Sequence, residues 1–160
     1  MKKIILILVA LCAVNMASAQ LPSVTVENMK GESVNVQDLA SDGKPMIISF
    51  WATWCHNCVL ELKAMHENLD EWRDTADFKI VAVSIDDARS TSKAKTMASG
   101  NGWTEDFTIL LDKNQDLKRA MNVNLIPHTF VVDGEGNIIY SHTSYTPGSE
   151  WELFEKIKGL

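Results

Sequence analysis

Residues 50–58 read FWATWCHNC and directly follow the apolar run at 46–49. Two cysteines separated by two residues, where a strand ends and a helix begins, are typical of a redox-active dithiol. The same spacing by itself also occurs in zinc sites and in structural disulfides. Here a helical pattern follows the pair, and the isolated Pro127 precedes a second apolar strand. This context favours thiol–disulfide chemistry.

The residues that flank the dithiol predict a strand–helix–strand unit. Apolar side chains recur at steps of three and four, which predicts an amphipathic helix from Cys55 to about Trp72. The nearly continuous apolar run at 78–85 is rich in β-branched residues and predicts a strand buried on both faces. A strand, a helix and a strand in this order form a right-handed parallel crossover. The periodic residues of the helix are Val59, Leu62, Met65, Leu69 and Trp72.

The remaining segments complete one α/β domain. Two glycines at 134 and 136 indicate a hairpin between two apolar segments, and a serine and glycines bound a second helix. We therefore expect a mixed central sheet with helices on both faces and a short N-terminal strand extension. The expected strands are 24–27, 34–39, 46–52, 107–111, 129–133 and 137–142, and the further helices are 90–100, 115–121 and 149–158.

The first nineteen residues have the pattern of a secretory signal peptide. Lys2 and Lys3 form a basic start, an apolar run follows at 4–14, and residues 17–19 are the small-residue pattern Ala-Ser-Ala. The apolar run is far shorter than the roughly 20 residues of a membrane span. We expect residues 1–19 to be removed after Ala19, together with Cys12. The mature protein is then a single domain, residues 20–160, in the periplasm or another extracytoplasmic compartment.

The composition of the mature chain narrows its partners. Its 141 residues retain 13 basic and 21 acidic side chains, a net charge of −8, and only two cysteines, Cys55 and Cys58. An acidic chain without a basic patch is a poor partner for nucleic acid or an anionic membrane surface. Export to an oxidising compartment makes disulfide chemistry available. A dithiol that works there in its reduced form needs a second protein that resets it, and we expect the chain itself to be a monomer.

Placing Cys55 at a helix start suits nucleophilic attack, because thiolates are the reactive form and the unpaired N–H groups of the first turn stabilise an anion. Cys58 lies one turn further into the helix and is expected to be less exposed. Cys55 would attack a substrate disulfide, and Cys58 would resolve the mixed disulfide. A purely structural disulfide is the alternative, but closing so small a loop contributes only roughly 2 kcal/mol.

The neighbours of the cysteines are candidates for tuning and docking. His56, when protonated, would favour the thiolate and make the disulfide more oxidising, and a solvent-facing residue with little effect is the alternative. Asn57 either caps the helix or is tolerated in its first turn. Trp51 is expected in the core, whereas Trp54 abuts the exposed sulfur and is expected to offer an apolar docking surface.

Three further positions are candidates because of where they stand. Glu61 follows Cys58 by three residues, on the same side of the helix, where a carboxylate can relay the Cys58 proton; a solvated charge is the alternative. Pro127 precedes a strand, and a cis bond to Ile126 would leave backbone groups free for an extended substrate, although cis bonds are a minority among X-Pro bonds. His128 either lines the same groove or is exposed. His66 and His142 have no partner in the sequence and are expected at the surface.

The motifs at 50–58, 126–130 (IPHTF) and 133–136 (DGEG) together resemble the thioredoxin superfamily. More narrowly, they are similar to the exported TlpA/ResA-type thioredoxin-like oxidoreductases, over almost the whole mature chain. The resemblance implies a thioredoxin-like fold, a cis Pro127 facing the dithiol, a functional acid at Glu61, and substrate positioning by Ile126 and Pro127. It implies no cofactor beyond the disulfide.

The same resemblance implies an activity and a partner. The chain would exchange disulfides with exported proteins as a reductant, with cytochrome c maturation as the best-known role of the group; general reduction or oxidation of exported proteins is the alternative. A membrane protein that donates or accepts electrons would reset the dithiol. Two positions depart from the family, where proline commonly precedes the second cysteine and threonine follows the cis-proline. Here these are Asn57 and His128, both at positions that tune redox potential and substrate choice.

Two other classes of protein use similar residues. Two thiolates can bind Cu(I) with His128 or His56 assisting, but exported copper-delivery relatives generally have three residues between their cysteines. A peroxiredoxin-like thiol peroxidase usually has threonine or serine where Ala52 stands. No metal site is predicted, since a structural zinc site needs four ligands and the mature chain has one cysteine pair.

Overall fold

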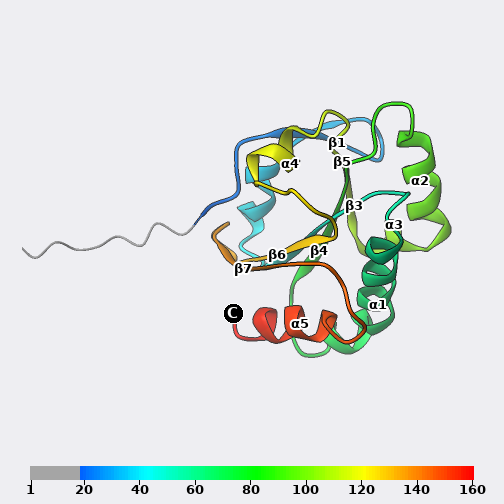
Figure 1. Ribbon diagram of the computed structural model, residues 1–160. Helices are drawn as coiled ribbons and strands as arrows, with labels where there is room; N and C mark the ends of the chain where they lie inside the picture. The colour runs from blue at the N-terminus through cyan, green and yellow to red at the C-terminus, as the bar shows by residue number, and fades with distance from the viewer. Residues whose placement is uncertain (1–18) are drawn as a thin grey trace, which may run out of the picture.

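The computed structural model describes residues 19–160, and almost all of the predicted signal peptide lies outside that range. The described residues form one seven-stranded mixed sheet with the strand order β2-β1-β5-β4-β3-β6-β7 (Figure 1). This confirms the predicted fold class. The strands are β1 (Thr25–Asn28), β2 (Ser33–Asn35), β3 (Met46–Trp51), β4 (Lys79–Ser84), β5 (Thr108–Leu111), β6 (His128–Val132) and β7 (Ile138–Thr143).

The centre of the sheet is parallel and its margins are antiparallel. Strands β3, β4 and β5 run in one direction, and every residue of β3 is buried. Burial on both faces explains the continuous apolar sequence of β3 and β4. Strand β6 pairs antiparallel with β3, and β1 pairs antiparallel with β5. The carboxyl ends of the three parallel strands therefore meet at one edge of the sheet, where β3 leads into the dithiol segment.

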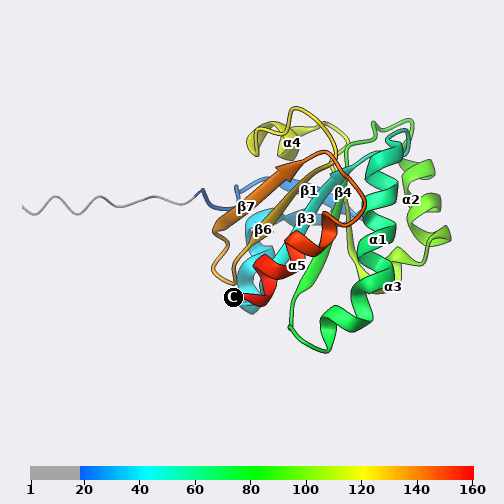
Figure 2. The ribbon, with the colours of Figure 1, turned by 60° about the horizontal axis from the view of Figure 1, so that its bottom comes forward.

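The helices cover both faces unequally (Figure 1 and Figure 2). Helices α1, α2, α3 and α5 lie on one face, and α4 lies on the other together with a 3-10 helix, η1. The strand β3, helix α1 and strand β4 form the predicted parallel crossover. The helices are η1 (Val36–Asp42), α1 (His56–Arg73), α2 (Thr91–Gly100), α3 (Trp103–Asp106), α4 (Asp116–Ala120) and α5 (Glu150–Lys158).

Two local predictions were wrong or incomplete. The strand expected at 34–39 ends at Asn35, because the Asn35 side chain accepts a hydrogen bond from the Gln37 backbone N–H at 3.0 Å and starts η1 instead. That helix ends at Gly43, which has a φ of 72°. The short helix α3 was not predicted. It begins after Gly102, whose φ of 75° favours glycine, and its buried residue is Trp103.

The start of the described chain is held by the β6–β7 hairpin. The Ile138 N–H donates to the Ala19 carbonyl at 2.7 Å, and the Leu21 N–H donates to the Gly136 carbonyl at 2.9 Å. The residues that follow the predicted cleavage position are thus part of the folded domain. Within residues 19–160, no helix is both long enough and apolar enough to cross a membrane.

An aromatic cluster joins α1 to α5. The Trp72 ring is fully buried and stacks on the Phe154 ring, with centroids 4.9 Å apart and an interplanar angle of 4°. Phe78, next to β4, packs against both rings. Trp151 contacts the same cluster edge-on but retains 36% exposure. The cluster fixes the two helices against each other on the face of the sheet that carries α1.

We predict that Trp72→Ala lowers the free energy of unfolding by about 3–5 kcal/mol, because it leaves a large cavity between the two helices. Trp151→Ala is the matched control, and it should cost less because that ring already contacts water. Urea unfolding followed by circular dichroism measures both. Equal losses for the two variants would contradict a core centred on Trp72.

Candidate active site

The two cysteines lie where β3 passes into α1. They form a disulfide with an S–S distance of 2.08 Å and a Cα–Cα distance of 5.3 Å. Cys55 is the N-cap residue of α1, and its Sγ accepts a hydrogen bond from the Cys58 backbone N–H at 3.3 Å. Cys55 is 9% exposed and Cys58 is fully buried. As expected, Cys55 is the more exposed residue of the pair.

The first turn of α1 suits a thiolate at Cys55. Unpaired N–H groups and the positive end of the helix dipole favour an anion at an N-cap. The turn contains no acidic residue that would oppose it. His56 and Asn57 are both exposed in this turn. Asn57 does not cap the helix, because Cys55 occupies the N-cap position.

A buried carboxylate holds the turn that precedes the dithiol. Asp86, 3% exposed, accepts hydrogen bonds from the Thr53 backbone N–H at 2.9 Å and from the Thr53 hydroxyl at 2.7 Å. The Ser84 hydroxyl donates to the same carboxylate at 2.8 Å. This contact was not predicted from the sequence. A polar residue directly after a buried strand was the signal that could have found it.

Pro127 stands at the same sheet edge. The Ile126–Pro127 peptide bond is cis, which agrees with the expectation taken from the family resemblance. His128 pairs with Phe50 across β6 and β3, so Pro127 lies beside the end of β3 from which the dithiol segment continues. Pro127 is buried and Ile126 is half-buried.

Two large apolar side chains are exposed near this edge. Trp54, the residue before Cys55, is 68% exposed, and Leu125, two residues before the cis-proline, is also 68% exposed. Exposed large apolar residues in two segments that meet at one edge indicate a contact surface. Trp51, by contrast, is fully buried and packs edge-on against Trp103 at 5.4 Å, as a core residue.

Glu61 is fully buried on α1 against the sheet. The hydroxyls of Thr129 and Ser49 donate to its Oε2 at 2.7 and 3.1 Å, and Nε2 of His142 lies 2.8 Å from its Oε1. Ser49 and Thr129 pair across β3 and β6, so the carboxylate lies over the middle of the sheet. The solvated-charge alternative for Glu61 is therefore excluded.

The histidines are placed differently from what the sequence suggested. His142 and His66 were both expected at the surface without partners; both are half-buried, and each has a carboxylate partner, so the expectation of no partner was wrong. His142 binds Glu61, with its side chain 13% exposed, and His66 Nε2 lies 3.0 Å from an Asp106 carboxylate oxygen. Neither pairing was predictable, because each joins residues about 40 or more positions apart.

His128 lies apart from the Glu61 group. Successive residues of a strand point to opposite faces, so His128 and Thr129 face different sides of the sheet. The His128 ring stacks on Phe130 with centroids 4.3 Å apart, and its buried Nδ1 has no hydrogen-bond partner among the described residues. Burial, and secondarily the positive charge of His142, lower the pKa of His128 below its ordinary value.

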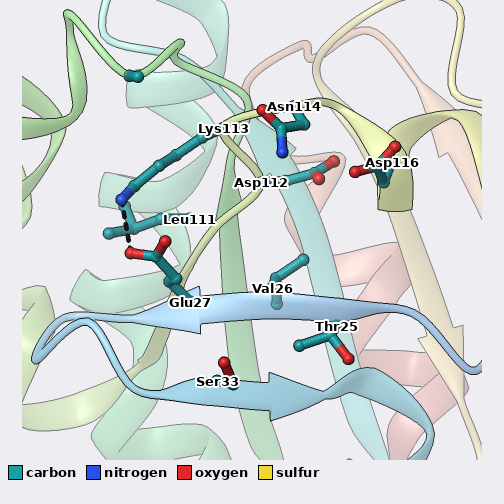
Figure 3. Close-up of a pocket in the computed structure, with 10 residues that line it drawn as sticks. Thr25, Val26, Glu27, Ser33, Leu111, Asp112, Lys113, Asn114 and Asp116 are labelled. Atoms are coloured by element: carbon teal, nitrogen blue, oxygen red, sulfur yellow. Dashed lines mark hydrogen bonds and ion pairs between the residues drawn. The ribbon is translucent and has the colours of Figure 1, made fainter.

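A separate cleft of about 340 Å³ lies between β1, β2 and the loop from β5 to α4 (Figure 3). Its polar lining includes the ion pair of Glu27 with Lys113 and the carboxylate of Asp112. Asp112 accepts hydrogen bonds from the N–H groups of Leu117 and Lys118 and so begins α4. None of the predicted site residues lines this cleft.

The family model described as the AhpC/TSA family matches residues 17–141, so the chain belongs to that family. The chain is 31% identical to "Thioredoxin-like protein YneN" of Bacillus subtilis (strain 168), over 83% of this chain and 75% of that protein. It is 30% identical to "Thiol:disulfide interchange protein DsbE" of Yersinia pestis, over 77% of this chain and 64% of that protein. The chain thus spans a little under two thirds of that second relative.

Solved structures agree with the fold. The solution structure of an uncharacterized thioredoxin-like protein from Porphyromonas gingivalis is 50% identical, with a TM-score of 0.78 over 89% of this chain and 92% of that chain. A putative DsbE from Chlorobium tepidum has the same fold at 20% identity and a TM-score of 0.70, over 89% and 97% of the two chains. The fold and the Cys55–Cys58 pair, with these relatives, define a thioredoxin-like thiol–disulfide oxidoreductase.

We predict that acidification destabilises the protein through His128. Because the folded state lowers the pKa of His128, the unfolded chain takes up a proton first as the pH falls through about 6.5. The stability contribution is therefore complete above that pH and is lost below it. The difference between the urea midpoints at about pH 7.5 and about pH 5.5 measures this loss of stability. The difference should be smaller in His128→Thr. The exposed His56 gives the control, since His56→Ala should leave the loss unchanged; an unaltered loss in His128→Thr would contradict the prediction.

Proposed function

We propose that the protein reduces disulfides of exported proteins through Cys55 and Cys58. The observation that carries the proposal is the placement of Cys55 at the N-cap of α1, bonded to a fully buried Cys58, at the sheet edge where the cis Pro127 stands. This arrangement gives one accessible sulfur for attack and one sheltered sulfur for resolution. No cofactor beyond the disulfide is needed for this chemistry.

Each step of the proposed reaction balances in atoms and electrons. The Cys55 thiolate attacks one sulfur of a substrate disulfide and forms a mixed disulfide, and the other substrate sulfur leaves as a thiolate. Cys58 then loses its proton and attacks Cys55. The Cys55–Cys58 disulfide forms, and the second substrate sulfur leaves as a thiolate. The substrate gains two electrons, which a membrane donor must later return to the protein dithiol.

The substrate would dock along the edge beside Pro127. A cis-proline before β6 leaves backbone groups of residues 125 and 126 available to an extended chain, because the pairing of β6 with β3 begins only at His128 and the Pro127 carbonyl already accepts a hydrogen bond from the Ser144 N–H. Trp54 and Leu125 would contact apolar side chains on either side of the attacked disulfide. We assign substrate positioning to Ile126 and Pro127, and we assign tuning of potential and substrate choice to His56, Asn57 and His128.

In our proposal, Glu61 makes the dithiol a reductant. Its buried carboxylate lies three residues from Cys58 on α1 and opposes a negative charge on that sulfur. A dithiol whose thiolates are disfavoured prefers the disulfide and is therefore a better reductant. The exposed His56 would act in the opposite sense when protonated, but it lies in solvent, where its charge is screened.

The compartment and partners complete the proposal. The signal-peptide pattern of residues 1–19 and the similarity to DsbE support a periplasmic or other extracytoplasmic location. There the protein would act as a monomer, and a membrane protein would supply its electrons. Apocytochrome c is the substrate that the family resemblance favours, and the test is whether the mature protein reduces a disulfide across a haem-attachment Cys-x-x-Cys-His peptide.

We predict that Cys55→Ser abolishes disulfide exchange, because it removes the attacking sulfur. Cys58→Ser should accumulate mixed disulfides with substrate proteins, because the resolving sulfur is missing. Non-reducing gels and mass spectrometry of the mature variants show both outcomes. Turnover by Cys58→Ser at the wild-type rate would refute a two-cysteine mechanism.

We predict a reduction potential of the Cys55–Cys58 pair near that of thioredoxin, about −270 mV, and far from the value of about −120 mV typical of the oxidant DsbA. Glu61→Gln should raise the potential, since it removes the charge that opposes a Cys58 thiolate. Equilibration with a dithiol buffer measures both proteins. A wild-type value near the DsbA figure would mean that the protein oxidises its substrates.

A further inference from the structure

Glu61 is sealed from water by its own partners. The carboxylate is fully buried, and so are Ser49 and Thr129, whose hydroxyls bind its Oε2. The third partner, His142, retains 13% exposure of its side chain at the border of the sheet. Of the groups that bind Glu61, His142 is therefore the one that contacts solvent. A proton that enters or leaves Glu61 from water has its shortest hydrogen-bonded route through the His142 ring.

The charges around Glu61 point to the same residue. An isolated buried carboxylate is strongly disfavoured unless a counter-charge faces it. Within residues 19–160, the only ion-pair partner of Glu61 is His142, at 2.8 Å. A protonated His142 makes the pair neutral.

One other cation stands near the pair: Lys156 Nζ on α5 lies 5.1 Å from the centroid of the Tyr140 ring, which packs edge-on against His142, but within residues 19–160 it forms no ion pair with Glu61. The remaining titratable groups around the pair supply no positive charge at neutral pH. Burial, and then Glu150 and Glu61, raise the pKa of Tyr145 to about 12, so this phenol stays neutral. The lowered pKa of His128 keeps that ring neutral at the same pH. On the face of the pair these groups are Tyr140 on β7, Tyr145 after β7, Glu150 and Glu152 on α5 and Glu67 on α1, and His128 on β6 faces the other side of the sheet.

We infer that His142 is the positioning residue that exchanges protons between Glu61 and solvent during each redox cycle. When Cys58 attacks the mixed disulfide, its S–H bond breaks and the proton passes to the Glu61 carboxylate. His142 then releases its Nδ1 proton to water, while its Nε2–H continues to donate to Oε1. The pair begins as carboxylate with imidazolium and ends as carboxylic acid with neutral imidazole.

The return step restores both residues. When an electron donor reduces the Cys55–Cys58 disulfide, the Cys58 thiolate takes the proton from Glu61, and His142 takes a proton from water at Nδ1. The buried pair has no net charge at either end of the cycle, but in the reduced protein its negative member, Glu61, is the one that shares α1 with Cys58 and so still disfavours a thiolate there. One proton thus crosses to or from solvent at His142 for each proton that Cys58 loses or gains. The inference rests on the proposed two-cysteine mechanism and adds the route of its proton.

The test follows the two steps of one turnover separately. Excess reduced protein is mixed with Ellman's disulfide, and the release of thionitrobenzoate is recorded by stopped flow. The first equivalent reports attack by Cys55, and the second reports resolution by Cys58. Attack by Cys55 needs neither Glu61 nor His142. A first-phase rate equal to that of the wild-type protein therefore shows that the start of α1 is intact in each variant.

We predict that His142→Gln slows the second phase about tenfold or more, as Glu61→Gln does, and leaves the first phase unchanged. Glutamine can still donate a hydrogen bond to Glu61 but cannot carry a proton, so a merely structural role would leave this variant at the wild-type rate. His142→Ala should be slow in the same phase, and imidazole added to the solution should restore it. The matched control is His66→Gln, which removes another carboxylate-bound histidine of the chain and should not change either phase.

The outcomes separate this inference from the proposed function. A wild-type second phase in His142→Gln, with Glu61→Gln still slow, overturns the proton route and leaves the two-cysteine mechanism intact. Failure of imidazole to accelerate His142→Ala overturns it as well. A wild-type protein without any second phase would instead overturn the proposed function itself.

Discussion

The turn between β3 and α1 is held by one buried carboxylate, and the active site depends on that turn. Asp86, at the end of β4, binds both the backbone N–H and the hydroxyl of Thr53. The Cys55 N–H donates to the Ala52 carbonyl at 3.0 Å, so the chain turns sharply before the helix begins. Because Cys55 then becomes the N-cap, the rotation of α1 about its axis is set, and with it the residues that face the sheet.

That rotation places Cys58 and Glu61 on the buried side of α1. A carboxylate is tolerated there because β3 and β6 present two hydroxyls, from Ser49 and Thr129, at paired positions beneath it. The edge strand β7 adds His142. The fold therefore surrounds Glu61, one helical turn after Cys58, with hydrogen-bond partners inside an otherwise apolar core. Such a buried polar group is stable only when every member has a partner. The same rotation of α1 leaves Cys55 at the exposed start of the helix and buries Cys58.

The polar residues near the dithiol lie on opposite faces of the sheet. Glu61, Ser49, Thr129 and His142 gather on the face that carries α1, whereas His128 points to the opposite face and stacks on Phe130. A substitution at His128 therefore changes the sheet edge beside Pro127 and removes a partly buried ring. Such a substitution does not touch the Glu61 carboxylate, which lies one turn after Cys58 on α1.

The sequence by itself determined the strand–helix–strand unit around the dithiol, the positions of most strands and helices, and the roles expected of Cys55 and Cys58, whereas the role expected of Glu61 came from the family resemblance. These features depend on local periodicity and on spacings of three or four residues, which are visible in the sequence itself. The cis form of Pro127 came only from a family resemblance, since the local bond favours trans. Only the tertiary structure decided the partners of Glu61, the anchoring of Thr53 by Asp86, and the separation of His128 from His142. The contacts of Thr53 with Asp86, of Glu61 with Thr129 and of Glu61 with His142 join residues 33, 68 and 81 positions apart, and such contacts leave no periodic trace in the sequence. The separation of His128 from His142 depends on which face of the sheet each strand position occupies, which strand pairing decides.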